Sequence, residues 1–174
     1  MPVSTCPERT STAPNAQDAV WVANGPTNQL FYPYVSSCVA VTLVFANGLL
    51  GGHASQVTTN AQNPQLQPAQ NLQAVINRMI PLAPAAATRG AFKKIYFIGT
   101  ADDPGWQLAQ ATTQITTAFG APTTAQPAKI DLTPVDIVFD TPSGTLYMVK
   151  RQGPSQGAAQ TVIDAQAIDA ELPY

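Results

Sequence analysis

The chain has 174 residues, of which 45% are hydrophobic, so it is long enough for one domain with a substantial core. Only 10% of the residues are charged, the formal net charge is -2, and lysine and arginine do not cluster, which argues against nucleic-acid binding. No apolar run approaches the roughly 18 to 20 residues needed to cross a bilayer, so no membrane span is predicted.

The N-terminal sequence MPVSTCPERTSTAPNAQDA is polar and contains no basic region followed by an apolar one, unlike a secretory signal peptide. We therefore expect a disordered leader over residues 1–17 and a single folded domain over residues 18–174. If the protein leaves its cell, it must be secreted by a signal-peptide-independent route or delivered into a target cell. Cys6 lies in this leader, so we expect Cys6 to be dispensable and a disulfide with Cys38 to be absent.

The first part of the domain is rich in β-strand signals. Strands are predicted, in chain order, over Ala19–Asn24, Leu30–Val35, Cys38–Phe45 and Leu49–Val57. Pro33 favours an edge position for the second strand. The third strand is a continuous β-branched run, typical of a strand buried on both faces. Asn47-Gly48 favours a tight turn, so the third and fourth strands should form a hairpin.

The second part mixes helices with strands. Helices are predicted over Pro68–Ile80, Asp103–Phe119 and the Ala-rich tail Gly157–Glu171. Asp103-Pro104 supplies an N-cap and a first-turn proline, and Gly120 ends that helix. Strands are predicted over Lys93–Thr100, Val135–Asp140 and Thr145–Arg151. Hairpins with interspersed helices indicate an α+β fold, a mixed or antiparallel sheet or sandwich with helices packed around it.

Cys38 begins the buried strand, and His53, the only histidine of the chain, lies on the returning strand. As a nucleophile, Cys38 would stand behind the small residues Ser36-Ser37, with backbone N–H groups of the bend holding an oxyanion. His53 would lower the pKa of the thiol and protonate the leaving group. Alternatively, Cys38 is a core residue, as free cysteines often are, and His53 makes an ordinary polar contact.

The register of the hairpin decides whether the two side chains meet. With Asn47-Gly48 as a two-residue turn, His53 pairs with Thr42 and faces the same way as Cys38, but about 13 Å further along the strand. Contact then requires a shifted register, a wide loop or a bulge at Gly51-Gly52.

The run SSCVAVTLVFANGLLGGH resembles the Cys–His segment of a bacterial glutamine deamidase superfamily. This superfamily includes the CheD-type chemoreceptor deamidases, cytotoxic necrotizing factor and Burkholderia lethal factor. Cys38 matches the family nucleophile, His53 the base, and Ser36 the serine two positions before the cysteine. The resemblance is confined to this segment, and it implies a deamidase-toxin-like fold.

The sequence departs from the family pattern at two positions. Ser37 stands where glycine is usual, immediately before the nucleophile. Tyr32 stands where a threonine often orients the histidine, so a main-chain carbonyl near Tyr32 or Val22 would have to take that role.

The resemblance implies a protein glutamine deamidase that needs no metal or organic cofactor. Its partner is a protein substrate with an exposed glutamine; an acceptor amine in place of water would give transglutamination. The N-terminus and the lack of a signalling domain favour a bacterial toxin or secreted effector acting on a host or competitor protein, while a chemotaxis-type deamidase would be cytoplasmic. The alternatives are another Cys–His amidase or protease, and a non-catalytic protein-binding module with Cys38 in its core.

Other polar and aromatic residues have simpler explanations. A zinc site is not expected, because the chain has one histidine, two cysteines and no CxxC or HxxxH pattern. Asp131, Asp136 and Asp140 fit a solvated strand face, and Trp21 fits a core or rim position. The long polar loop Asn60–Gln70 is the best candidate for a recognition loop.

Overall fold

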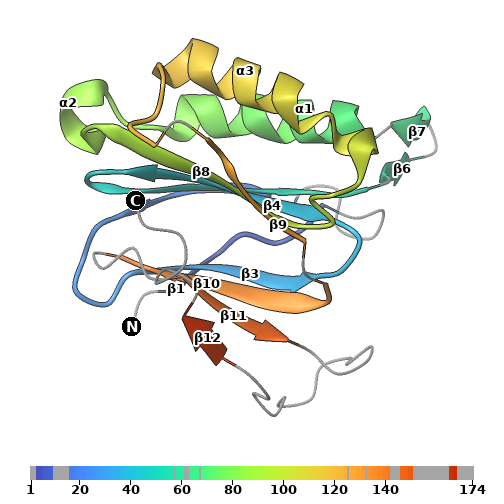
Figure 1. Cartoon of the computed structure of the whole chain (residues 1–174), viewed down its shortest axis with the longest axis horizontal. Coiled ribbons are helices and arrows are strands. Elements are labelled where there is room, and N and C mark those ends of the chain that lie inside the picture. The colour runs from blue at the N-terminus through green and yellow to red at the C-terminus, as the bar shows by residue number, and fades with distance from the viewer. Residues whose placement is uncertain are drawn as a thin grey trace.

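A computed structural model of the chain describes residues 3–9, 16–56, 58–60, 63–66, 68–124, 126–131, 133–141, 146–150 and 165–167. These residues form two five-stranded mixed sheets, a two-stranded ribbon and several helices, which confirms the predicted α+β class. The molecule has three layers, in which α1 (Pro68–Met79) and α3 (Leu108–Phe119) cover one sheet and the second sheet packs beneath it (Figure 1).

The central sheet has the order β2-β5-β4-β8-β9. Its strands are β2 (Ala19–Ala23), β4 (Val39–Phe45), β5 (Gly48–Ala54), β8 (Phe92–Gly99) and β9 (Ala128–Asp131). Every residue of β4 and β5 is buried, because helices cover one face of this sheet and the second sheet covers the other. The continuous apolar run of β4 is thus explained by its central place.

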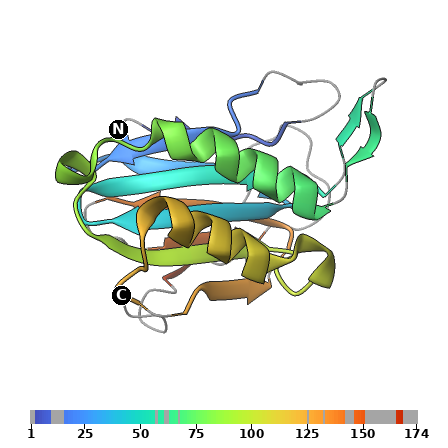
Figure 2. The same ribbon diagram turned by 90° about the horizontal axis from the view of Figure 1, so that it is seen from above.

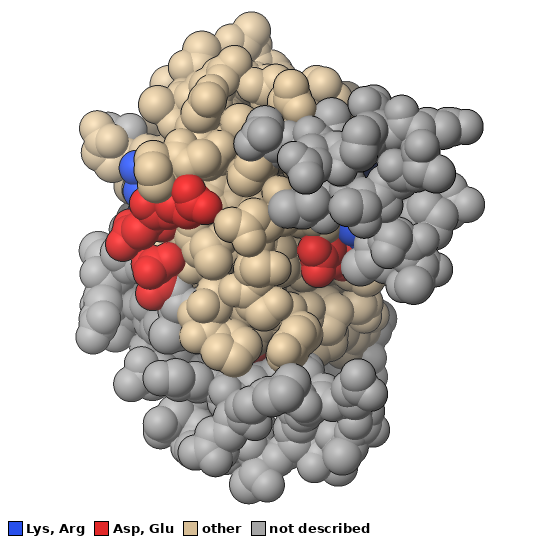
Figure 3. All heavy atoms as spheres, turned by 90° about the vertical axis from the view of Figure 1, so that its right-hand side faces the viewer, with Lys and Arg blue, Asp and Glu red and all other residues tan. Residues whose placement is uncertain are grey.

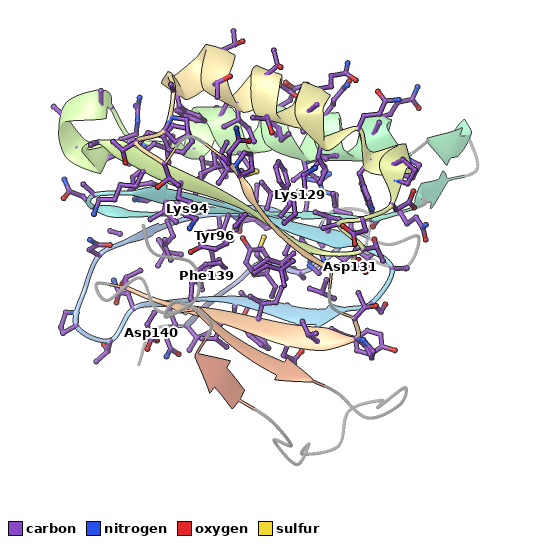
Figure 4. The ribbon with its side chains drawn as sticks, in the orientation of Figure 1. Lys94, Tyr96, Lys129, Asp131, Phe139 and Asp140 are labelled. Carbon is purple, nitrogen blue, oxygen red and sulfur yellow. The ribbon has the colours of Figure 1, made fainter. Side chains whose placement is uncertain are left out.

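The second sheet has the order β1-β3-β10-β11-β12. Its strands are β1 (Val3–Thr5), β3 (Gln29–Val35), β10 (Val135–Asp140), β11 (Leu146–Lys150) and β12 (Ala165–Ala167). Aromatic side chains fill the space between the sheets, where Tyr96 of β8 and Phe139 of β10 meet edge to face at 5.4 Å (Figure 4). The candidate site residues described below lie in this same inter-sheet layer.

Residues 3–9 belong to the fold, in contrast to the expected disordered leader. β1 pairs in parallel with Gln29–Phe31 of β3, and the N–H of Cys6 continues the pairing by donating to the carbonyl of Phe31 (2.8 Å). β1 pairs only with the first half of β3, and Pro33 lies in the second half. The part of β3 that lacks proline therefore has a neighbouring strand on both sides, although Pro33 favoured an edge position for the strand. Residues 1, 2 and 10–15 lie outside the described residues.

The helices begin and end slightly differently from the predictions. Asp103 caps a 3-10 turn, η2 (Pro104–Trp106), by accepting from the N–H of Gly105 (2.8 Å), and α3 starts only after Gln107, whose positive φ breaks the run. Gly120 ends α3 as predicted. α1 stops at Met79 and continues into the 3-10 turn η1 (Ile80–Leu82), which the short helix α2 (Ala86–Arg89) follows.

Two segments take forms that the sequence did not predict. The loop expected over Asn60–Gln70 contains most of a ribbon made by β6 (Thr58–Asn60) and β7 (Asn63–Leu66), which projects beyond one end of α1 (Figure 2). In the tail predicted to be helical, residues 165–167 form β12, while 157–164 and 168–171 lie outside the described residues. None of the helices in the described part of the chain is long and apolar enough to cross a membrane.

Candidate active site

The β4–β5 hairpin turns one residue earlier than predicted. Its two turn residues are Ala46 and Asn47, so Phe45 pairs with Gly48 and Ala40 pairs with His53. Gly48 is the first strand residue, and Trp21 of β2 packs over it, so that a Cβ on Gly48 would lie 2.5 Å from the Trp21 ring. The glycine therefore makes room for an aromatic side chain instead of supplying the turn.

This register brings Cys38 and His53 together without a bulge. His53 moves from the predicted partner Thr42 to Ala40, and Cys38 lies two residues before Ala40 on the same face. The two side chains are then diagonal neighbours across adjacent strands, a separation that long side chains bridge. His53 Nε2 lies 3.0 Å from Cys38 Sγ.

The other ring nitrogen of His53 fixes the direction of this contact. Nδ1 lies 3.0 Å from the main-chain carbonyl oxygen of Cys6, which only accepts hydrogen bonds, so Nδ1 carries the proton. Nε2 is then the acceptor, and the Cys38 thiol donates to it. This arrangement places a base against the thiol and holds the imidazole in one tautomer.

The predicted main-chain orienting group therefore exists but comes from Cys6, and neither Tyr32 nor Val22 supplies it. The Tyr32 hydroxyl donates to the carbonyl of Val41 (2.8 Å) and lies 2.7 Å from Thr42 Oγ1. Its ring meets that of His53 edge to face at 5.9 Å, so Tyr32 forms a wall for the imidazole. The role of Cys6 was not predicted from the sequence, because residues 1–17 were expected to be a disordered leader.

The bend before β4 surrounds the thiol with backbone donors. The N–H groups of Ser36, Ser37 and Cys38 lie close enough to the sulfur to lower its pKa. Ser36 is half-buried and Ser37 is exposed, and the role of their main chain in an oxyanion hole stays a prediction.

The main chain of Cys38 is fixed from the neighbouring end of β8. Its carbonyl accepts from the N–H of Thr100 (3.1 Å), and Trp106 Nε1 donates to the Thr100 hydroxyl (3.0 Å). Gly99 has a φ of 131°, and a Cβ there would lie 2.2 Å from the Cys38 carbonyl oxygen. Only glycine allows this approach, and no sequence pattern indicated that Gly99 supports the site.

Both side chains of the pair are inaccessible, with exposures of 0% for Cys38 and 1% for His53. Burial raises the pKa of the Cys38 thiol to about 12, and the nearby Glu8 acts in the same direction, against the backbone N–H groups. Burial also lowers the pKa of His53. The structure therefore holds a neutral thiol against a neutral imidazole, whereas the sequence led us to expect a lowered thiol pKa.

The segment after β1 lies against the pair and is tied to the central sheet. One ligand atom each from Glu8, Cys38 and His53 lies within 4.8 Å of the others. Arg9 pairs with the buried carboxylate of Asp18 at 3.1 Å, and its carbonyl accepts from the Ser55 hydroxyl (2.8 Å). The N–H of His53 donates to the Asp18 carbonyl (2.9 Å), so these contacts join the N-terminal segment to the residue before β2 and the residue after β5.

The remaining candidates lie away from the pair. Trp21 packs on Phe45 at 5.8 Å in the helix-facing core. Asp136 accepts from the N–H of Tyr34 (2.7 Å), Asp140 from the Gln29 amide (2.5 Å), and Asp131 from the N–H of Asp102 (3.5 Å). Since these aspartates hold loops and strand ends together, the solvated-face interpretation is incomplete, and none of these contacts links them to the thiol.

Comparison with known proteins adds no relative from which to transfer a role. No protein-family model matches the chain, and no curated protein sequence matches it significantly.

Proposed function

We propose that the protein is a cysteine-dependent protein glutamine deamidase, which converts an exposed glutamine of a protein substrate to glutamate. The observation that carries this proposal is the contact of 3.0 Å between Cys38 Sγ and His53 Nε2, with Nδ1 held by the Cys6 carbonyl. A nucleophile, a base and a group that orients the base are the parts that covalent acyl transfer requires. The resemblance of the Ser36–His53 segment to bacterial deamidases supports glutamine as the acyl donor.

The first half-reaction forms a thioester. The Cys38 proton moves to His53 Nε2, and the thiolate attacks the carboxamide carbon of the substrate. The N–H groups at Ser36, Ser37 and Cys38, which converge near the sulfur, stabilise the oxyanion. The C–N bond then breaks as Nε2–H protonates the departing ammonia.

The second half-reaction restores the enzyme. His53 takes a proton from water, the hydroxide attacks the thioester, and Cys38 leaves as a thiolate that recovers its proton from the imidazolium. The products are glutamate and ammonia, and a primary amine in place of water gives transglutamination. Neither half-reaction uses a metal or an organic cofactor.

Turnover requires the site to open, since the reacting atoms are buried in this structure. Glu8 is only partly buried and reaches to within 4.8 Å of the thiol and the imidazole, so a short movement of the segment around Glu8 would admit a glutamine side chain. We propose that the site opens on binding its protein substrate, and that the protein is a toxin or secreted effector that acts on a host or competitor protein.

The test uses a lysate of candidate target cells in oxygen-18 water. The wild-type protein should convert specific glutamines to glutamates that carry the heavy oxygen, whereas Cys38→Ser and His53→Ala should not. Labelled glutamate at the same positions with Cys38→Ser would contradict the proposal. Cleaved peptide bonds in place of deamidated side chains would instead indicate a Cys–His protease.

A second candidate, a non-catalytic binding module with Cys38 in its core, is favoured by the complete burial of the thiol and by its raised pKa. Alkylation separates the two. If the site opens for catalysis, iodoacetamide should modify native Cys38 much faster than global unfolding allows, whereas a core cysteine reacts only on unfolding. His53→Ala should slow the reaction in an enzyme, because the thiol then loses its base.

A further inference from the structure

The fold gathers three different metal-binding side chains that are far apart in the sequence. Glu8 follows β1, Cys38 precedes β4 and His53 lies near the end of β5, yet one ligand atom of each lies within 4.8 Å of the other two. The atoms are a carboxylate oxygen, a thiol sulfur and an imidazole nitrogen, a donor set that zinc accepts readily. We did not expect a zinc site from the sequence, which has no CxxC or HxxxH pattern, but such short spacings cannot reveal ligands that strand pairing brings together.

The histidine has the support that a metal ligand usually has. Metal-binding histidines commonly donate their second ring N–H to a carboxylate, a backbone carbonyl or water, which fixes the tautomer and the ring plane. In this protein His53 Nδ1 lies 3.0 Å from the Cys6 carbonyl, so the lone pair of Nε2 is directed toward Cys38 Sγ at 3.0 Å. The hydrogen bond from His53 Nδ1 to the Cys6 carbonyl would therefore orient the imidazole equally well as a base or as a metal ligand.

The surroundings also suit a divalent cation. A thiolate and a carboxylate together balance the double charge of the cation, so the occupied site is neutral in a buried environment. Figure 3 views the right-hand side of Figure 1, toward which β5 ends, and shows acidic side chains with little basic surface among the described residues of that face.

We infer that Glu8, Cys38 and His53 form a site for a thiophilic divalent cation, with zinc as the ion that best matches the donors, and that the bound ion blocks the nucleophile. On binding, the cation replaces the thiol proton, which passes to solvent, and gains one sulfur, one nitrogen and one oxygen ligand without any redox change. A fourth position remains for water on the side of the partly exposed Glu8. The inhibitory role of the cation rests on the proposed deamidase activity, whereas binding of the cation does not.

The test begins with the full-length protein, stripped of metal with a chelator and titrated with Co²⁺ as a spectroscopic substitute for zinc. One equivalent should produce a sulfur-to-cobalt charge-transfer band, which an equivalent of Zn²⁺ removes. Zn²⁺ should also protect Cys38 from iodoacetamide, and a chelator should reverse that protection. Absence of the band in the wild-type protein, or equal alkylation with and without Zn²⁺ of a Cys38 that does react in the metal-free protein, would overturn the inference.

Matched variants then assign the ligands. Glu8→Gln should weaken Zn²⁺ binding at least about tenfold, as losses at metal sites usually do. Asp102→Asn, which neutralises an exposed carboxylate elsewhere, should bind as the wild type does. Equal affinities for these two variants would refute the assignment of Glu8.

The cobalt band does not depend on turnover, so the two proposals fail separately. A band in a protein without deamidase activity leaves the metal site standing, and activity that saturating Zn²⁺ leaves unchanged refutes the inhibitory role.

Discussion

Cys38 stands between two opposing influences on its thiol. Burial, with the charge of Glu8, favours the protonated thiol, whereas the backbone N–H groups of the Ser36–Cys38 bend favour the thiolate. The effect of burial is the larger one in this structure, so the pKa of the Cys38 thiol rises to about 12. The bend nevertheless holds its donors ready for negative charge on sulfur or on an oxyanion, so an opened site would shift the balance toward the thiolate.

This balance predicts a loss of stability at high pH. The Cys38 thiol is protonated in the native state up to a pKa of about 12, while in the unfolded chain it ionises at its ordinary value near 9.0. Its contribution to the free energy of unfolding is therefore complete below pH 9.0 and is lost as the pH rises toward about 12. Differential scanning fluorimetry should show a steeper fall of Tm over this range for the wild type than for Cys38→Ser. Parallel curves would show that the native thiol is not held protonated.

At the scale of elements, the short strand β1 is more important than its length suggests. It carries Cys6 into position beside β3, where the Cys6 N–H donates to Phe31 (2.8 Å) and the Cys6 carbonyl accepts from His53 (3.0 Å). Pro7 adds to this, because a residue before proline prefers an extended conformation. The orientation of the base therefore depends on the pairing of a three-residue strand.

Two substitutions at Cys6 should separate its side chain from its main chain. Cys6→Ser keeps the N–H and the carbonyl, so activity should stay near the wild-type level, although the buried polar side chain lowers stability by about 1–2 kcal/mol. Cys6→Pro removes the N–H that anchors the segment and should lower kcat about tenfold or more through misorientation of His53. Steady-state deamidation and urea unfolding measure both effects. Equal kcat values for the two variants would rule out main-chain support by Cys6.

Gly99, which ends β8, and Gly120, which caps α3, offer a second matched pair. Gly99 and Gly120 both have positive φ, at 131° and 84°, but a Cβ would lie 2.2 Å from the Cys38 carbonyl oxygen at Gly99 and meet nothing within 4 Å at Gly120. Gly120→Ala should therefore cost only the backbone strain, about 1 kcal/mol, with activity unchanged. Gly99→Ala should be less stable still and should lose activity, because Cys38 must move away. Comparable Tm and kcat values for the two variants would contradict this role of Gly99.

At the scale of the whole molecule, the sequence predicted the helices and strands better than the contacts between them. The apolar run of β4 and the apolar face of α1 identified an α+β fold, because their patterns depend on local burial alone. The site depends on longer-range facts: Gly48 lies under Trp21 of β2 and begins β5 without being part of the turn, and the carbonyl of Cys6 reaches His53 through the pairing of β1 in the other sheet. No local pattern contains that information.

The three layers also place residues of the helix-facing core on the opposite face of the central sheet from the candidate site. Leu43 points into the core between the central sheet and the helices, while Cys38 and His53 face the second sheet. Leu43→Ala should therefore cost about 2–4 kcal/mol by leaving a cavity, yet leave the pair in place. Cys38→Ser is nearly isosteric and should leave most of the stability intact.

The most direct test of the account is therefore the deamidation rate per folded molecule for these two variants. Folded fractions come from urea unfolding, and rates come from incorporation of heavy oxygen into the converted glutamate. Leu43→Ala should be markedly less stable but turn over like the wild type once corrected for folding, whereas Cys38→Ser should be folded and inactive, because a serine hydroxyl beside this imidazole is a far poorer nucleophile. Folded Cys38→Ser protein with wild-type deamidation would contradict the assignment of Cys38 as the nucleophile.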